Sequence, residues 1–369
     1  SERRPAVNLF TLFLSDGTSL TAHLNRGADG LPAANGVASF PFRVLVPPSV
    51  IATLGTDGPA RFLQFGHGLF TSLDEVDGDG VTVFADRGRF VVMAVEYLGM
   101  TAADQASIIP AFAGDIQELF RFEDRVYQAF ANQLAVPYAA RGGLTELDAL
   151  KQDGSLLYDP SHFYYYGISN GHILGASYVA LSRDIDRAVF NVGGAGYDLI
   201  LTRSAAFASL KALATGAFPN PLDYQKFVTL SSTSFDRIDP ITTAPHLLAD
   251  PYPGAPAGRV VLLQSGTGDT SVPRLASELH ARVLGIPVIG PMNREIPGVS
   301  TVAGPITGSG YAVYDFQKDP EPGYEAILPA ANEVHGAVRM LNAAMDQSSD
   351  FLKPGGQIIN HCDGVCDPE

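Results

Sequence analysis

Hydrophobic and polar positions change their spacing near residue 60, and the change separates two patterns. Residues 7–24 alternate as NLFTLFL and SLTAHL around an Asp-Gly pair, which is typical of a β-hairpin. A further short apolar run covers residues 42–46 and ends at two prolines. We therefore expect residues 1–50 to supply antiparallel strands at the edge of a larger sheet.

From residue 61 onward, short continuous apolar runs alternate with segments of helical periodicity. A continuous run predicts a strand covered on both faces, and strands that alternate with helices predict a mostly parallel sheet. The longest helical pattern covers residues 115–134. We expect an α/β fold whose strands lie at residues 61–66, 90–95, 162–168, 187–192, 259–264 and 311–316.

One connection between expected strands is unusually long. Residues 197–258 contain helical pieces and several prolines, and the length of this segment exceeds what a plain crossover between two strands needs. We expect an inserted cap over the carboxyl edge of the sheet, within a single domain that covers residues 1–369. Residues 142–154 and 285–310 are expected to be loop-rich, and residues 351–369 to form a tail.

Composition and charge narrow the class of protein. The chain is 46% hydrophobic and 17% charged, so it can bury a sizeable core. Its net charge of −15 argues against binding to nucleic acid or to anionic membrane surfaces, because both need a basic face. No apolar run reaches the roughly 18 residues that a membrane span requires. The first residues lack the apolar core of a signal peptide, so we expect a mature or trimmed form.

The two cysteines, Cys362 and Cys366, lie close together near the end of the chain. Such a pair forms either a small disulfide loop or half of a metal site. A metal site would need two more ligands, and only His361 and Asp363 are local. We favour the disulfide, which indicates an oxidising compartment and hence a secreted or periplasmic protein.

The candidate chemistry centres on Gly167–Gly171, a G-x-S-x-G pentapeptide. In a nucleophile elbow, a sharp strand-to-helix turn exposes the serine hydroxyl, and flanking glycines remove Cβ atoms that would clash. The pentapeptide alone is weak evidence, because an ordinary loop can have the same sequence. Here an aromatic strand pattern precedes it, and Gly175 and Ala176 follow on a helix face that could pack closely on a sheet. We therefore predict Ser169 as a nucleophile.

A nucleophilic serine needs a base to take its proton and a carboxylate to orient that base. Asp269 follows the expected strand 259–264 in a glycine-containing turn, although a helix cap is the commoner role for such an aspartate. Asp239 is the weaker alternative. His335 follows the last expected strand and completes the order Ser, Asp, His, with His361 as the runner-up base.

An oxyanion needs two N–H donors. The backbone N–H of Asn170 directly follows the nucleophile, and that of Leu69 lies in a Gly-His-Gly turn after an early strand. A simple turn is the alternative interpretation of that motif. We expect Leu69, Phe70 and residues of the cap to wall an apolar substrate pocket, and His172 to lie near or crowd the site.

Together these motifs resemble the α/β-hydrolase superfamily, most closely the secreted bacterial serine esterases and lipases of the H-G-x oxyanion type. The resemblance spans roughly residues 40–350 and is carried by residues 66–69, Ser169, Asp269 and His335. It implies an eight-stranded, mostly parallel sheet and a Ser-His-Asp triad. The elbow departs from the usual lipase pattern, with S-N-G-H where S-Q-G-G is more common.

The expected function is therefore a serine carboxylic-ester hydrolase that acts on apolar acyl or aryl esters, including lipid or polyester, through an acyl-enzyme. It needs no cofactor, and we expect a monomer. A peptidase or acyltransferase on the same fold is the first alternative, and a non-catalytic binding module is the second.

One acidic stretch partly fits a calcium-binding loop. Residues 75–86 contain E-x-D-x-D-G with an aspartate at the twelfth position, so both end ligands are the less usual residue. The stretch also covers the place where a hydrolase has its first helix. We favour a solvated acidic turn.

Overall fold

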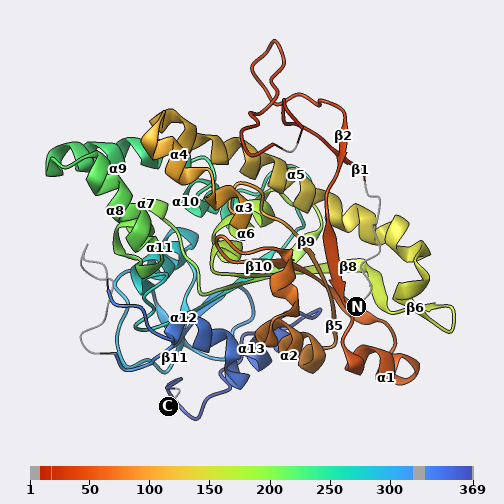
Figure 1. The fold of residues 1–369 in the computed structure, drawn as a ribbon. Helices are drawn as coiled ribbons and strands as arrows, with labels where there is room; N and C mark the ends of the chain where they lie inside the picture. Colours follow the sequence, from red (N-terminus) through yellow and green to blue (C-terminus); the bar gives the residue numbers. More distant parts are fainter. Residues whose placement is uncertain (1–8, 18, 319–328, 368–369) are drawn as a thin grey trace. The chain divides into compact units, whose positions relative to one another are not determined.

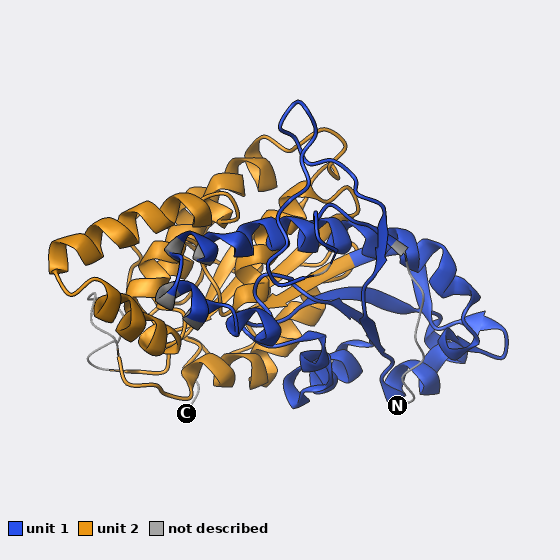
Figure 2. Cartoon of the chain, turned by 45° about the horizontal axis from the view of Figure 1, so that its top comes forward, with its two compact units in different colours: residues 1–163 blue, residues 164–369 orange. Residues whose placement is uncertain are grey.

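The computed structural model describes two compact units, Ser1–Phe163 and Tyr164–Glu369 (Figure 2). The boundary lies inside strand β8 (Tyr158–Ile168). The single domain expected over residues 1–369 therefore stays a prediction. The structure describes the whole chain except residues 1–8, 18, 319–328 and 368–369.

The predicted hairpin over residues 7–24 is not a regular pair of strands. Within its described part only one isolated bridge joins the two arms, and residues 7–8 and 18 lie outside the described residues. Instead, β1 (Leu9–Thr11) pairs antiparallel with β2 (Val37–Ser39), and these two strands form a small sheet of their own. Of the antiparallel edge strands predicted in residues 1–50, only β3 (Phe42–Leu45) joins the larger sheet among the described residues.

A side chain of helix α5 (Phe122–Arg141) explains this difference. Gln128 Oε1 accepts the N–H of Phe13 at 2.7 Å, and Gln128 Nε2 donates to the carbonyl of Thr11 at 3.0 Å. These two main-chain groups are thus satisfied by a side chain, whereas Leu12 between them bonds the backbone of Asn35 and Gly36 beside β2.

The main strands of unit 1 follow the sequence prediction. β4 (Ala60–Gly66) runs parallel to β5 (Phe90–Val95, labelled in Figure 1), and β3 runs antiparallel to β5. Every residue of β5 is buried, as its unbroken apolar run predicts. Helix α2 (Asp79–Gly88) connects β4 to β5 and packs on β5.

Helix α1 (Pro48–Asp57) was not predicted, because Pro47 before it and Pro48 at its start were interpreted as the end of a strand. Proline suits the first turn of a helix, where its missing N–H is not needed. The predicted helix over 115–134 is a 3-10 turn, η2 (Ile116–Arg121), followed by α5. The other elements of unit 1 are η1 (Leu73–Asp77), α3 (Ala102–Gln105), α4 (Ile108–Ala113), η3 (Gly143–Glu146), η4 (Asp148–Leu150), β6 (Lys151–Gln152) and β7 (Ser155–Leu156).

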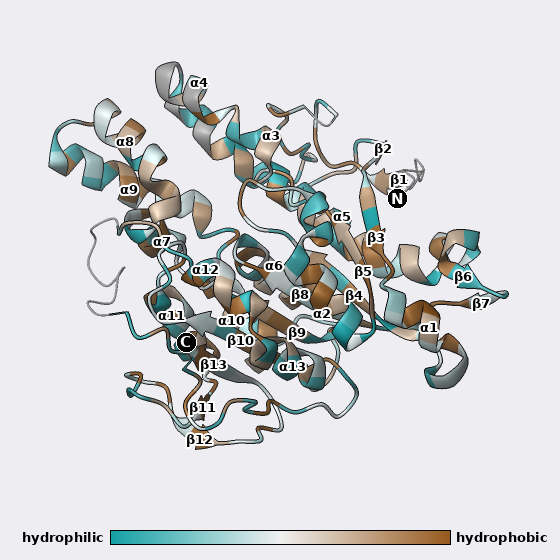
Figure 3. Cartoon of the chain, turned by 60° about the horizontal axis from the view of Figure 1, so that its bottom comes forward, coloured by the Kyte–Doolittle hydropathy of each residue, from teal (hydrophilic) through white to brown (hydrophobic). Residues whose placement is uncertain are grey.

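The sheet strands of unit 2 are in the order β8, β9, β10, β13, β11 and β12. β10 runs parallel to both β9 and β13, and β11 runs parallel to both β13 and β12. The hydropathy colouring of Figure 3 shows brown, apolar strands at the centre of this unit. The strands other than β8 are β9 (Ile185–Asn191), β10 (Val260–Gly266), β11 (Val288–Gly290), β12 (Thr301–Ala303) and β13 (Gly310–Tyr314).

Helices cover these strands. α6 (Asn170–Leu181) follows β8 and packs on β9, whereas α11 (Arg274–Leu284) and α13 (Asn342–Phe351) pack on β10. The short helix α12 (Val334–Ala337) and the 3-10 turn η7 (Val338–Met340) lie directly before α13 in the chain. None of the helices in the described part of the chain combines the length and apolarity needed to cross a membrane.

The segment predicted as a cap, residues 197–258, is helical. Its last two elements pack against α6 and α11, and so belong to the helical layer of the unit. Its first helices pack on one another, and their role as a cap stays a prediction. The segment consists of α7 (Tyr197–Arg203), η5 (Ala205–Phe207), α8 (Ala208–Ala217), α9 (Pro221–Phe235), α10 (Pro240–Ala244) and the π-helical turn η6 (Pro245–Ala249).

The tail contains the predicted disulfide between Cys362 and Cys366. Before the disulfide, Ile358 pairs with Ile306 through two backbone hydrogen bonds of 2.9 and 3.0 Å. The carbonyl of Cys366 accepts the N–H of Asp315, just after β13. The tail therefore bonds the rest of unit 2 at Ile358 and at Cys366.

Candidate active site

Ser169 occupies a strained turn between β8 and α6. Its φ of 54° and ψ of −117° lie outside the regions that non-glycine residues ordinarily adopt. The Ser169 N–H donates to the carbonyl of Asn191, the last residue of β9, at 2.9 Å. The carbonyl of Ser169 accepts the N–H groups of His172 and Ile173 in the first turn of α6. This strand–serine–helix geometry is that of a nucleophile elbow.

The glycines around the serine are required by close packing. A Cβ on Gly167 would lie 2.1 Å from the carbonyl oxygen of Gly171, and one on Gly175 would lie 2.3 Å from the hydroxyl oxygen of Tyr165. The Tyr165 hydroxyl in turn donates to the Gly171 carbonyl at 2.6 Å. The turn is thus closed on itself, and α6 lies directly against the tyrosine of β8.

Backbone hydrogen bonds bring the carboxyl ends of neighbouring strands together. Beyond the bond from Ser169, the N–H of Val192 after β9 donates to Gln264 of β10 at 2.8 Å. The N–H of Thr267 after β10 donates to Tyr314 at the end of β13 at 2.9 Å. The loops that follow β8, β10 and β13 therefore leave the same edge of the sheet, with about 5 Å between adjacent strands.

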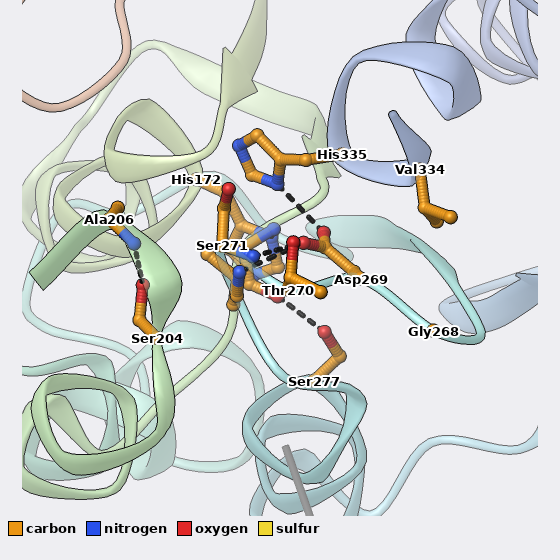
Figure 4. Close-up of polar contacts among 12 residues, drawn as sticks. His172, Ser204, Ala206, Gly268, Asp269, Thr270, Ser271, Ser277, Val334 and His335 are labelled. Carbon is orange, nitrogen blue, oxygen red and sulfur yellow. Dashed lines mark hydrogen bonds and ion pairs between the residues drawn. The ribbon is translucent and has the colours of Figure 1, made fainter. Parts of the chain in front are cut away.

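Asp269 and His335 meet at this edge. The Nδ1–H of His335 donates to Asp269 Oδ2 at 2.7 Å (Figure 4). The other carboxylate oxygen, Oδ1, accepts the N–H groups of Ser271 and Val272 at 2.8 and 3.0 Å. The Asp269 side chain is 1% exposed and that of His335 is 17% exposed, so a buried acid orients a partly accessible imidazole. With Nδ1 as the donor, Nε2 carries the lone pair that a base needs.

The serine and the histidine are not joined by a hydrogen bond in this structure. Among the described residues, the Ser169 hydroxyl has no hydrogen-bond partner. Catalytic hydrogen bonds are often long or misaligned before substrate binds. The structure thus brings the predicted acid and base together, and the contact between Ser169 and His335 stays a prediction.

The alternative acid and base are engaged elsewhere. Asp239 accepts the N–H groups of Gly196, Tyr197 and Ile241, so its carboxylate connects the starts of α7 and α10. Burial raises the pKa of Asp239, and these backbone bonds only partly offset that effect. The imidazole of His361, the runner-up base, contacts Asp350 at 2.9 Å in the tail.

A serine on a strand-to-helix elbow, followed along the chain by an aspartate and a histidine at later strand ends, is the arrangement of α/β-hydrolases. The chain adopts an α/β-hydrolase fold. Its mostly parallel sheet agrees with the prediction, although unit 2 carries two strands, β11 and β12, in a segment that was expected to be loop-rich.

Comparisons with known proteins give only distant likenesses. No protein-family model and no curated protein matches the chain. Acetyl xylan esterase 1 of Thermoanaerobacterium sp. JW/SL YS485 is 14% identical, with 86% of this chain and 84% of that chain covered and a TM-score of 0.44. An acylaminoacyl peptidase of Pyrococcus horikoshii is 13% identical, with 86% and 41% covered and a TM-score of 0.46.

A third similar structure is an esterase of Pyrococcus furiosus, which is 10% identical, with 81% of this chain and 85% of that chain covered and a TM-score of 0.40. The chain spans only 41% of the length of the Pyrococcus horikoshii peptidase. These similarities carry no argument about activity. The α/β-hydrolase fold is assigned from the chain's own elbow and strand order.

The predicted oxyanion loop of unit 1 is held on both sides of Leu69. The N–H of Gly68 donates to Glu75 Oε2 at 2.7 Å, and the N–H of Phe70 donates to the carbonyl of Met100 at 2.8 Å. Phe70 has a φ of 53°, which turns the chain sharply after Leu69. Within the described chain, the N–H of Leu69 itself donates to no other group, so it is available.

His67 stiffens the same loop. Its buried Nε2 accepts the N–H of Tyr97 at 2.8 Å, and its Nδ1–H donates to the carbonyl of Gly68 at 2.8 Å. Burial lowers the pKa of His67 despite that backbone bond, which agrees with a neutral ring that both donates and accepts. Phe70 is half-buried, and its place in a substrate pocket stays a prediction.

The second predicted donor lies in the other unit. Asn170 is the first residue of α6, and its backbone N–H has no acceptor among the residues that the structure describes. Free N–H groups are expected in the first turn of a helix. The Asn170 side chain accepts the hydroxyl of Tyr197 at 2.8 Å. Each donor is therefore available, and their convergence on one oxyanion stays a prediction.

The acidic stretch at residues 75–86 contacts the chain's own donors. Glu75 accepts the N–H of Gly68, Asp77 pairs with Arg43, and Asp86 Oδ1 accepts the N–H of Ser49 at 2.8 Å. Part of the stretch forms α2. No three potential metal ligands gather anywhere in the described chain. These contacts do not favour the calcium-loop interpretation.

His172 lies inside unit 2 and is fully buried. Its Nδ1 accepts the N–H of Gly193 at 2.9 Å, and its Nε2 contacts Nδ1 of His280, on α11, at 3.0 Å. The ring stacks on Phe190 of β9, with 5.3 Å between the ring centroids. Its predicted place near the substrate is not favoured by this burial, because both ring nitrogens hold the loop after β9 against α11.

This buried pair predicts a loss of stability in acid. Burial lowers the pKa of His280 to about 3, and burial followed by the proximity of His280 lowers that of His172 well below its ordinary value. The unfolded chain protonates both rings as the pH falls through about 6.5. The contribution of the neutral pair to the free energy of unfolding is therefore complete above a pH of about 6.5. Below that pH it decreases by up to about 1.4 kcal/mol per pH unit for each ring.

The variant His280→Gln tests this expectation. At about pH 8 both rings are neutral, so the difference in the free energy of unfolding between the variant and the wild type, measured with denaturant, reports only the packing that the substitution removes. Between about pH 6.5 and pH 4.5, the stability of the variant should fall less steeply than that of the wild type. Parallel decreases in the two proteins would contradict the buried neutral pair.

Proposed function

We propose that the chain is a serine hydrolase that cleaves carboxylic esters. The observation that carries the proposal is the strained backbone of Ser169 on the same sheet edge as the 2.7 Å contact between His335 and Asp269. A residue held in a rarely populated backbone conformation at the end of a strand is typical of a functional site. The buried, doubly hydrogen-bonded carboxylate supports the role of Asp269 as the group that orients the base.

The proposed acylation follows from these roles. Ser169 Oγ attacks the carbonyl carbon of the ester while Nε2 of His335 takes its proton. Asp269 keeps the imidazole in its orientation and stabilises the cation that forms. The backbone N–H groups of Leu69 and Asn170 bind the oxyanion. The carbon–oxygen bond of the ester then breaks, and the imidazolium returns its proton to the departing alcohol.

Deacylation repeats the same chemistry with water. His335 takes a proton from water, the hydroxide attacks the acyl-enzyme, and the acid leaves as Ser169 recovers its proton. Every step uses groups of the chain itself. We propose apolar acyl or aryl esters as substrates, including lipid or polyester, because the predicted oxyanion loop carries the apolar residues Leu69 and Phe70. We also propose a secreted or periplasmic location, because a disulfide such as Cys362–Cys366 persists in oxidising compartments.

The preference for esters over amides is directly testable. The protein should hydrolyse a p-nitrophenyl ester much faster than the p-nitroanilide of the same acyl group. A peptidase would cleave the matched anilide with comparable kcat/KM, and that result would overturn the ester assignment while keeping the serine mechanism. A panel of esters from acetate to long acyl and aromatic acids would then define the pocket.

A further inference from the structure

Asn332 joins the loop of the acid to the helix of the base. It precedes α12, three positions before His335. Its side-chain Nδ2 donates to the carbonyl of Gly268 at 2.8 Å, and its Oδ1 accepts the N–H of Val334 at 3.2 Å. The hydroxyl of Thr270 contacts Asn332 Oδ1 at 3.3 Å and accepts the Asn332 backbone N–H at 3.1 Å.

These contacts surround the acid–base pair. Gly268 and Thr270 flank Asp269 in the chain, and Val334 precedes His335. One amide therefore holds the residues on both sides of the acid to the residue next to the base. The 2.7 Å contact between Asp269 and His335 depends on two loops that arrive from different strands, and Asn332 is the side chain that bridges them.

The acid loop has little freedom to compensate for a lost bridge. Gly268 has a φ of 82°, and a Cβ at this position would lie 2.3 Å from Cγ of Lys318. The bridge also requires a donor and an acceptor on one short planar group, which an amide provides. Aspartate would keep the acceptor toward Val334 and Thr270 but would lose the donor toward Gly268.

We propose that Asn332 is a positioning residue for the acid–base pair, a role that rests on the proposed function. Among the described residues its bonds go to Gly268, Thr270 and Val334 and not to the side chains of the predicted triad, so it acts by fixing the distance between Asp269 and His335. A displacement of about 1 Å at a catalytic group can reduce the rate by about 100-fold. Loss of the bridge should therefore reduce kcat and leave KM nearly unchanged, because the groups that bind substrate remain.

Three variants of the full chain test the proposal. Asn332→Leu removes both the donor and the acceptor at similar volume, and we expect kcat to fall about 10- to 100-fold with KM within about twofold. Asn332→Asp should give a smaller loss. Glu333→Gln is the matched control, because this neighbouring side chain is exposed and, among the described residues, bonds Lys318 alone. It should retain the wild-type kcat.

A proton NMR signal distinguishes positioning from stability. The Nδ1–H of an imidazole bound to a carboxylate resonates far downfield, and the signal of the wild type should be lost in Asp269→Ala. It should weaken or shift in both Asn332 variants and remain in Glu333→Gln. If Asn332→Leu does not fold, Asn332→Asp carries the same kinetic and spectroscopic test.

Failure of the positioning role and failure of the proposed function would give different results. Wild-type kcat and an unchanged downfield signal in the Asn332 variants, with Ser169→Ala inactive, would overturn the positioning role alone. A kcat that falls only in proportion to the unfolded fraction would also overturn it. Ester turnover that survives Ser169→Ala would overturn the proposed function itself.

Discussion

Ser169→Ala should reduce ester turnover by about 10⁴- to 10⁶-fold, since the nucleophile and its triad partners act as a unit. The protein should keep its fold, because alanine is smaller and the Ser169 hydroxyl has no hydrogen-bond partner in the described chain. The measurement is kcat/KM for a p-nitrophenyl ester, together with thermal unfolding of both proteins. Binding of a substrate-like ester should change little.

The matched control for this variant is Ser271→Ala. Ser271 lies in the acid loop and contributes its backbone N–H to Asp269. Removal of its hydroxyl leaves that N–H in place, so activity should stay near that of the wild type. Equal activity of Ser169→Ala and Ser271→Ala would exclude Ser169 as the nucleophile.

Gly167→Ala should destabilise the protein by about 3 kcal/mol or more, because the added methyl group meets backbone atoms that cannot rotate away. The new Cβ would lie 2.1 Å from the Gly171 carbonyl oxygen and 2.5 Å from its carbon. Relief of this contact requires the elbow to open, so activity should fall as well. Denaturant unfolding measures the first effect, and ester turnover of the remaining folded protein measures the second.

Gly216→Ala provides the comparison. Gly216 lies in α8, and a Cβ at this position meets no atom within 4 Å. Alanine in a helix is favoured over glycine by about 1 kcal/mol, so this variant should be slightly stabilised. If Gly167→Ala were as stable as Gly216→Ala, the closed geometry of the elbow would be wrong.

The parts of the fold that could be predicted are those in which the local pattern and the tertiary environment agree. β5 is apolar at every position because helices and strands surround it, so its run predicted its bounds at residues 90–95. The elbow could be predicted because its backbone turn excludes side chains at Gly167. The disulfide could be predicted because no other cysteine was available to either partner.

The parts that were missed depend on distant contacts or on very short elements. Gln128, which lies more than 100 positions away, bonds the carbonyl of Thr11 at the end of β1 and the N–H of Phe13, and no local pattern can show this. β11 and β12 have three residues each and lie among prolines and glycines, which conceal their periodicity. The burial of His172 depends on His280 and Phe190, which are likewise remote in the chain.

In the candidate site too, some features follow from the local sequence and others depend on distant contacts. The contact between Asp269 and His335 could be predicted from their places after strands, because parallel strands deliver their loops to one edge, and their catalytic roles stay predictions. Asn332 was missed, although an asparagine just before a helical segment is a recognised capping signal and could have identified it. What the local signal cannot show is that the same amide also reaches Gly268, in a loop 64 positions earlier.

The most direct test of the central claim is covalent labelling with a fluorophosphonate, followed by peptide mapping of the modified residue. Such reagents capture a serine only when a base and an oxyanion site activate it. We predict a single modification on Ser169, and its loss in both Ser169→Ala and His335→Ala. Modification of a different residue, or no modification of a folded protein that hydrolyses esters, would contradict Ser169 as the activated nucleophile.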